Sequence, residues 1–192
     1  MLHILFMYMV NNQTKREFRS LPFLFFIFLM CFSSSVCGQN INKYYISSIQ
    51  ESGTLYFIEL NQEFENKIER SEFSYDLTYL TSKDSISLNF TYSDKIIRGI
   101  DSISFVQNNN RISSKAEKIF IETDKKLWNH RYSTKFLVKD MHTVFQQSLK
   151  PIILVHYGNE SMQLDVKNNK WRKQSEIMLK ILTLIEANIK TP

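Results

Sequence analysis

The segment FSYDLTYLTSKDSISLNFTY, residues 73–92, alternates between apolar and polar side chains on either side of a short polar centre. Alternation of this length is typical of β-strands that bury one face and expose the other to water. The polar centre, residues 82–84, is short enough for a tight connection, so the segment predicts an antiparallel hairpin. In its second half we expect Phe90 to face the core and Ser87 to face water.

Shorter patterns of the same kind occur on both sides of this hairpin. Residues 44–49 and 55–60 predict an earlier hairpin turned at Gly53, because glycine adopts the positive φ that tight turns often require. The polar segment 61–70 is compatible with either a helical turn or a loop. Further strands are expected at residues 100–106, 119–121, 131–138, 151–157 and 162–166.

Two helices are also expected. Asp140 is predicted to cap a short helix over residues 141–149, which Pro151 ends. From residue 169 onward the apolar positions recur with a helical period. This stripe consists of Trp171, Met178, Ile181, Leu182, Ile185 and Ile189. The apolar face of the sheet is the surface available to such a stripe. The predicted fold class is therefore α+β, a mainly antiparallel β meander packed against a long C-terminal helix, in a single domain over residues 39–192.

The N-terminal residues 1–38 have the parts of a secretory signal. Basic residues precede an apolar run at 21–32, and small residues follow it up to Gly38, so cleavage should leave Gln39 at the mature N-terminus. An uncleaved anchor is the first alternative, but the run is shorter than the roughly 20 apolar residues that a membrane span needs. Lipid attachment at Cys37 is the second. We expect an exported chain with no stable membrane span after cleavage.

The composition of the mature chain bears on its compartment. Both cysteines, Cys31 and Cys37, belong to the predicted signal, so the mature chain has no disulfide and must be stable through packing alone. This suits a bacterial periplasm better than an animal extracellular space. We therefore expect a periplasmic or extracellular location, with a Gram-negative bacterium as the source.

The charges bear on the kind of partner. Residues 39–192 hold 21 basic and 18 acidic side chains, which is no dense basic footprint, so nucleic acid is not expected as a partner. The signs are nevertheless uneven, with seven acidic residues in 51–76 and eight basic residues in 111–139. Two solvated faces would explain this pattern, and so would a polarised surface that orients a partner.

The mature chain holds no recognised catalytic or metal-binding motif. Its histidines are His130, His142 and His156, and none has the spacing of a metal site. His142 follows Asp140 by two residues, so the two side chains should point apart on a helix. No Gly-x-Ser-x-Gly sequence occurs, and glycine is too scarce for a phosphate-binding loop. We therefore expect no cofactor and no metal.

Two clusters are candidate binding residues. Trp128, His130, Arg131 and Tyr132 combine stacking rings with a guanidinium that can grip a carboxylate or phosphate. The alternative is a strand start in which Trp128 and Tyr132 pack on the core while His130 and Arg131 face water.

The second cluster, Arg172 and Lys173, lies at the start of the last helix, where free backbone N–H groups and cations favour an anion. Solvated side chains are the alternative there.

These observations favour a non-enzymatic exported domain that binds a partner protein or an apolar ligand on its sheet. One alternative is a hydrolase-type enzyme that uses His130 or His156 with a carboxylate brought close by folding. Another is a structural subunit of an envelope assembly. A pocket that contains both a histidine and a carboxylate would favour the enzyme. A deep apolar cavity would favour the ligand-binding domain, and an exposed apolar patch would favour the structural subunit.

Overall fold

The computed structural model describes residues 40–124, 126–147 and 149–189, which belong to one unit of the chain, Asn40–Pro192. The predicted signal segment, with its cleavage residues Gly38 and Gln39, lies outside the described residues. Within them, ten strands and two α-helices follow a short 3₁₀ helix, η1 (Ile41–Tyr44). The strands are β1 (Tyr45–Gln50), β2 (Gly53–Asn66), β3 (Ser71–Leu80), β4 (Ser85–Asp94), β5 (Ser102–Gln107), β6 (Asn110–Lys115), β7 (Glu117–Asp124), β8 (Leu127–Leu137), β9 (Ile152–Tyr157) and β10 (Glu160–Leu164). The helices are α2 (Val138–Gln146) and α3 (Asn168–Ile189).

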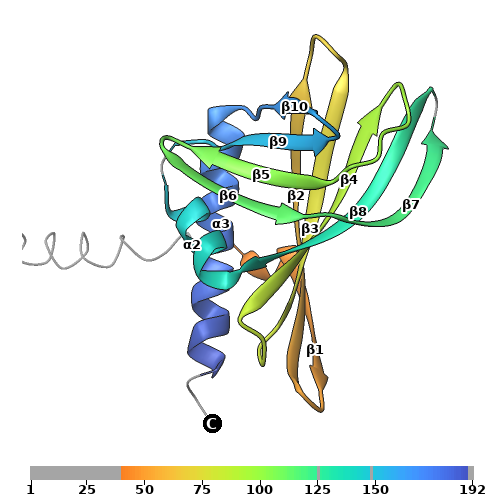
Figure 1. The fold of residues 1–192 in the computed structure, drawn as a ribbon. Helices are drawn as coiled ribbons and strands as arrows, with labels where there is room; N and C mark the ends of the chain where they lie inside the picture. Colours follow the sequence, from red (N-terminus) through yellow and green to blue (C-terminus); the bar gives the residue numbers. More distant parts are fainter. Residues whose placement is uncertain (1–39, 125, 148, 190–192) are drawn as a thin grey trace, which may run out of the picture. The chain divides into compact units, whose positions relative to one another are not determined.

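The strands form two antiparallel sheets (Figure 1). The larger has the order β1-β2-β3-β4-β8-β7, and the smaller has the order β10-β9-β5-β6. The predicted central hairpin is confirmed: β3 pairs with β4, Tyr75 lies opposite Phe90, and the buried side chains alternate with half-buried or exposed ones. The expected α+β class with a C-terminal helix on the sheet is therefore correct, although the sheet is divided in two.

The division occurs where β6 ends and β7 begins. Ala116 separates these strands, yet β6 pairs with β5 in the smaller sheet and β7 pairs with β8 in the larger one. A second link joins the sheets at their other side, where Glu65 of β2 and Asp165 exchange two backbone hydrogen bonds of 2.8 and 3.0 Å. The two sheets are thus tied together by main-chain connections as well as by the core.

Two strand predictions differ from the structure. Residues 61–66, expected to form a helical turn or a loop, continue β2, whose register against β3 shifts between Glu59 and Gln62. The shift marks a β-bulge or a similar irregularity in the pairing. Beyond it, the polar second half of β2 stays paired with β3 through main-chain hydrogen bonds, which do not require apolar side chains. The other difference is β6, which is polar and was not predicted; it follows a turn in which Asn108 has a φ of 52°.

Helix α2 begins earlier than predicted, and the expectation that Asp140 caps it is wrong. Leu137 occupies the N-cap without a side-chain hydrogen bond, and Asp140 lies in the first turn. Strand β8 runs directly into the helix, and the Val138 N–H donates to the carbonyl of Asp84 at 2.9 Å. A side-chain cap is therefore not needed for that donor, while Asp140 still suits the positive end of the helix dipole.

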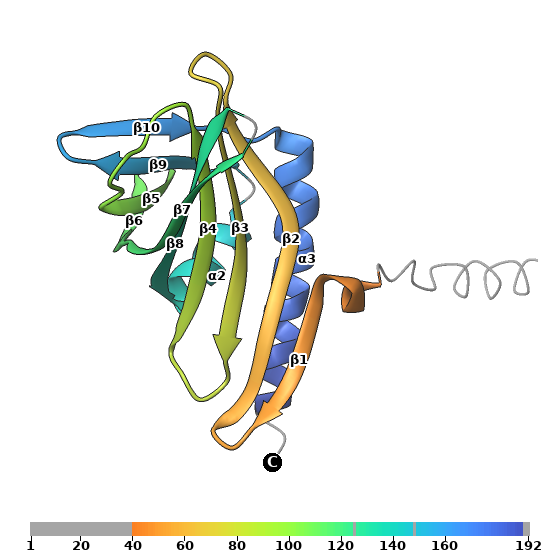
Figure 2. The same cartoon turned by 90° about the vertical axis from the view of Figure 1, so that its right-hand side faces the viewer.

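Helix α3 covers the apolar side of the larger sheet and lies alongside β2 (Figure 2). Trp171 is fully buried, stacks on Phe145 of α2 with ring centroids 5.5 Å apart, and meets Phe64 of β2 edge-on at 6.4 Å. The predicted stripe is buried except for its last member, because Ile189 is 47% exposed. The aromatic side chains on this face of the sheet therefore form the core and offer no open surface to a ligand.

Candidate functional site

The first predicted cluster is split by the alternation of β8. His130 and Tyr132 point into the core and are buried, whereas Arg131 lies on the outer face of the larger sheet. Tyr132 accepts a hydrogen bond from the Ile100 N–H at 3.2 Å. Trp128 is half-buried at the start of the strand, opposite Asp94. The structure thus does not bring these four side chains to one surface.

His130 is tied to main-chain groups through both ring nitrogens. Its Nε2 accepts from the Arg98 N–H at 2.9 Å, so its Nδ1 carries the hydrogen and donates to the Tyr92 carbonyl at 3.0 Å. The expectation that His130 faces water is therefore wrong. The ring holds the segment after β4 against β8, and neither nitrogen is left for a substrate.

The same segment is held by a buried ion pair. The Asp94 carboxylate accepts from Arg98 Nε at 2.5 Å and from the Tyr92 hydroxyl at 2.9 Å. Burial alone would raise the pKa of Asp94, but hydrogen bonds from Arg98, Tyr92 and the Lys95 N–H outweigh it and lower that pKa. The Arg98 guanidinium also lies over the ring of Tyr157, 4.2 Å from its centroid. All of these groups are satisfied within the fold, so we assign them to its stability.

Arg131 is also engaged within the protein. It forms an ion pair with Asp76 on β3 and donates to Thr91 Oγ1 at 3.2 Å. Asn89 links the same carboxylate to β4, with its Nδ2 2.9 Å from Asp76 Oδ1, and accepts from Ser133 at 2.9 Å. The Arg131 charge is therefore balanced across three strands of the outer face and is not free to grip an anion.

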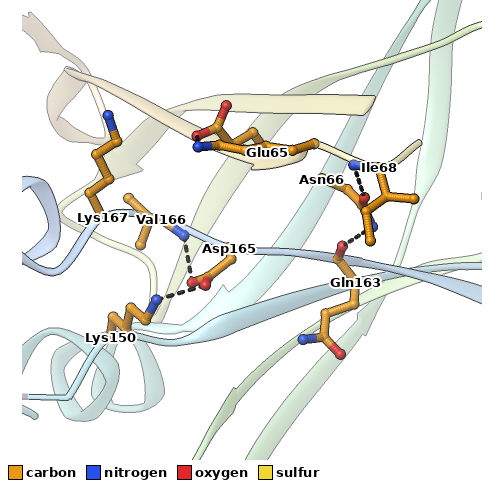
Figure 3. A pocket seen from close by; sticks show the side chains of 9 residues that line it. Glu65, Asn66, Ile68, Lys150, Gln163, Asp165, Val166 and Lys167 are labelled. Carbon is orange, nitrogen blue, oxygen red and sulfur yellow. Dashed lines mark hydrogen bonds and ion pairs between the residues drawn. The ribbon is translucent and has the colours of Figure 1, made fainter. Parts of the chain in front are cut away.

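Arg172 and Lys173 are exposed in the first turns of α3, and neither forms an ion pair within the described residues. Near this end of the helix lies an open pocket of about 510 Å³ (Figure 3). Its lining includes Lys167 and the pair Lys150–Asp165, whose Nζ and Oδ2 are 2.6 Å apart. Because Glu65 also lines the pocket, its charges are nearly balanced. The predicted anion site at Arg172 and Lys173 stays a prediction.

His156 has the most chemically suggestive surroundings of the three histidines. Its Nε2 lies 2.9 Å from the hydroxyl of Ser104, a separation typical of a nucleophile and its base. Ser104 is fully buried, however, and the same nitrogen lies 3.0 Å from the Arg111 guanidinium. The pKa of His156 is lowered, first by burial and then by Arg111, against an opposing effect of Asp101. A cation beside the ring disfavours the imidazolium that a general base must form.

No hydrogen-bond partner of His130 or His156 in the described residues is a carboxylate. His142 is half-buried on α2 and has no hydrogen-bond partner in this part of the chain. Three or more His, Cys, Asp or Glu side chains do not converge as a metal site within the described ranges. The histidine-and-carboxylate pairing that a hydrolase would need is therefore not present among these residues.

The edge strand β1 is the surface with the clearest capacity to bind. It pairs with β2 alone, and its sequence YISSIQ contains no charged residue and no proline. Ile46 is 74% exposed and Ile49 is 90% exposed. Proteins normally protect such edges with charges, bulges or proline, because an edge offers unpaired main-chain groups to another strand.

The opposite edge of the same sheet, β7, is protected. It carries four charged side chains, and its register against β8 shifts between Lys118 and Phe120. Ile119 and Phe120 are exposed there, but they stand beside Glu117 and Lys118. The difference between the two edges marks β1 as the one open to strand addition.

A pocket of about 320 Å³ adjoins β1. Ile46 lies opposite Phe57 of β2, which is 48% exposed, and both side chains belong to the outer face of the sheet. The lining residues are Lys43, Tyr44, Tyr45, Ile46, Phe57, Ile58, Glu59 and Asp76. An edge strand beside a partly apolar pocket can take both the main chain and a side chain of an added strand.

Sequence reasoning missed β1 as a site, although it predicted the strand. Its lack of charge is visible in the sequence, but its position at an edge depends on the order of the strands in the sheet. Alternation does not reveal that order.

Comparison of the chain with models of known protein families, with characterised proteins and with solved structures finds no significant similarity. Among the described helices, none combines the length and apolarity needed to cross a membrane. Function is therefore inferred from the site geometry.

Proposed function

We propose that the chain is an exported, non-enzymatic binding domain that takes up an extended segment of a partner protein beside β1. The observation that carries the proposal is the uncharged edge strand, which exposes Ile46 beside the pocket and Ile49 nearer its turn into β2. In strand addition, main-chain hydrogen bonds supply affinity and side-chain pockets supply specificity. Export rests on the sequence pattern of residues 1–38 and places the partner in the periplasm or outside the cell.

An apolar ligand on the sheet has less support. Phe73, Phe90 and Trp171 on the apolar side are fully buried by other parts of the fold, so a ligand there would have to displace packed side chains. The pocket beside β1 is lined by Lys43, Glu59 and Asp76 as well as by apolar groups, which suits a peptide better than a lipid or another purely apolar molecule.

Site-specific photocrosslinking in the native host tests the proposal. A photoreactive residue in place of Ser47 on β1 should give one defined protein adduct, and the same residue in place of Thr123 on β7 should not. The double variant Ile46→Lys and Ile49→Lys should abolish the adduct, because charges on an edge oppose strand pairing. The double variant Ile119→Lys and Phe120→Lys is the matched control on β7, and it should leave the adduct formed from position 47 unchanged.

The identity of the adduct separates the remaining alternatives. An adduct between two copies of this chain would favour a structural assembly built on β1. Equal adducts from both edges, or an adduct that survives the lysines on β1, would contradict strand addition at this edge.

A further inference from the structure

The smaller sheet, β10-β9-β5-β6, is seen in Figure 1. Its outer face carries a second, unrelated cluster of side chains. The register places Lys115 opposite Ser102 and Ser102 opposite His156, and the next row sets Ser104 opposite Ser113. Arg111, at the start of β6, lies opposite Val106. These side chains alternate with the buried residues Ile103, Phe105, Ile153 and Val155, so they lie on the side of the sheet away from the core.

Ser104 is the centre of a closely bonded group. Its hydroxyl lies 2.8 Å from Ser113 Oγ, 2.9 Å from His156 Nε2 and 3.1 Å from one terminal nitrogen of Arg111. That same nitrogen of Arg111 is 3.0 Å from His156 Nε2, and Arg111 Nε reaches Ser113 at 3.3 Å. The guanidinium is therefore held in place by hydrogen bonds to Ser104, Ser113 and His156.

The positive charge of this group forms no ion pair with a carboxylate among the described residues. Neither Arg111 nor Lys115 forms an ion pair with any described residue, and both are exposed. Arg111 can only donate, so His156 Nε2 accepts from it and the ring is neutral in this arrangement. Arg131 on the other sheet, by contrast, is paired with Asp76.

We propose that Arg111, Ser113 and His156 form a binding site for a tetrahedral oxyanion, phosphate or a phosphate ester. A preorganised guanidinium with free N–H groups matches phosphate oxygens, and an adjacent serine hydroxyl adds a further donor. The other terminal nitrogen of Arg111 has no partner among the described residues and is available to the anion. This site is separate from β1 and does not depend on the function proposed above.

Binding should strengthen as the pH falls. A proton on His156 Nε2 would face the Arg111 cation in the free protein, whereas with an anion present it becomes a further donor to that anion. The bound anion therefore raises the proton affinity of His156, and by linkage the proton raises the affinity for the anion. One linked proton limits the gain to about tenfold per pH unit.

Other charged groups lie on the elements around His156. Arg111 of β6 lowers the pKa of His156, and Asp101, which precedes β5, opposes that effect. Lys115 of β6 lies two strands away, beyond Ser102. Strand β10 places the uncharged Ser161 opposite His156, while its Glu160 pairs with Arg98 at 3.8 Å. Asp140 of α2 lines a pocket with Arg111 but forms no ion pair with it. Positive charge thus prevails at the ring.

The test is a titration of the full chain with inorganic phosphate and, separately, glycerol 3-phosphate, followed by NMR of the His156 ring at constant ionic strength. Wild type should show saturable shifts. The affinity for the phosphate dianion, corrected for the proton that phosphate and its ester take up near about pH 6, should increase between about pH 7.5 and about pH 5.5. Arg111→Gln should weaken binding by about tenfold or more. Arg70→Gln, a change at another exposed arginine that forms no ion pair with a described residue, should leave it unchanged. Binding of the ester as well as the free ion would identify a phosphate-bearing molecule as the ligand, and binding of phosphate alone would identify the free ion.

Two further variants keep the result decisive. His156→Asn, followed by calorimetry, should retain binding at neutral pH. Its affinity for the phosphate dianion, corrected for the titration of phosphate itself, should no longer change with pH. Ser113→Ala should weaken binding without changing the melting temperature. This variant takes the place of Arg111→Gln in the test if Arg111→Gln does not fold. The proposal is overturned if neither anion shifts the His156 resonances, if Arg111→Gln binds as wild type does, or if Arg70→Gln removes the binding.

Discussion

Phe90 lies at the centre of the core of the larger sheet. Its ring stacks on Phe73 with centroids 5.1 Å apart and on Tyr132 at 5.8 Å, and it is fully buried. We predict that Phe90→Asp prevents folding, because an unpaired buried charge costs several kcal/mol and a domain has only about 5–15 kcal/mol of stability. Leu88→Asp should behave in the same way. Far-UV circular dichroism and thermal unfolding are the measurements.

The control for this prediction is Ser87→Asp. Ser87 is half-buried on the outer face, where its neighbours across the strands are Thr78 and Lys135, so a carboxylate there meets no like charge. Asn89→Asp is a poorer control, since Asn89 donates to Asp76 and the change would place two carboxylates together. Equal melting temperatures for Ser87→Asp and Phe90→Asp would show that the two faces of β4 are wrongly assigned.

His130 shows where reasoning from single residues fails. The alternation that places Tyr132 in the core also places His130 there, two residues earlier, yet its polarity suggested a solvated position. The structure satisfies the ring with the Tyr92 carbonyl and the Arg98 N–H. Both partners belong to segments about 30 residues or more away, so no local pattern could reveal them.

At the scale of elements, α3 should be indispensable. Its buried side chains include Trp171, Met178 and Ile185, and each large apolar side chain contributes about 1.5–3 kcal/mol when fully buried. Truncation after Lys170 removes all of them and uncovers the aromatic side of the larger sheet. We predict an insoluble or molten product, recognised by loss of near-UV circular dichroism and of a cooperative melting transition.

A change at the exposed start of the same helix provides the comparison. Arg172→Glu with Lys173→Glu should leave the melting temperature unchanged or slightly raised, because acidic residues suit a helix N-terminus. A truncated chain that melts cooperatively at the wild-type temperature would show that α3 does not belong to the core.

Helices and strands that bury one continuous face were predicted from the sequence, whereas β6 and the polar second half of β2 were not. The β3–β4 hairpin and the stripe of α3 each bury one continuous face, so their periods are clear in the sequence. Strand β6 has exposed residues at most positions, and the second half of β2 is rich in polar residues. Both are held by main-chain pairing to β5 and β3, which leaves little trace in the side-chain pattern.

At the scale of the whole molecule, the sequence predicted one sheet and the structure has two. The switch at Ala116 assigns two consecutive strands to different sheets, and the bridge between Glu65 and Asp165 joins segments that are distant in the chain. The candidate sites depend on this arrangement, because Arg111 reaches His156 across β5 and β1 is an edge only by virtue of the strand order. The composition and the periodicity of the apolar residues therefore predicted the class of the fold. They did not predict the edge position of β1 or the cluster of Arg111 and His156.

Processing is the last prediction and concerns the whole chain. The described core side chains run from Tyr56 to Ile185, so a chain that begins at Gln39 retains every one of them. We expect the protein exported by its own host to begin at Gln39, with its N-terminal glutamine cyclised to pyroglutamate. Intact-mass spectrometry of the exported protein checks this, and a chain of residues 39–192 made without the signal should melt at the same temperature. A mass that retains residues 21–32, or one that carries a lipid on Cys37, would instead show an anchored protein.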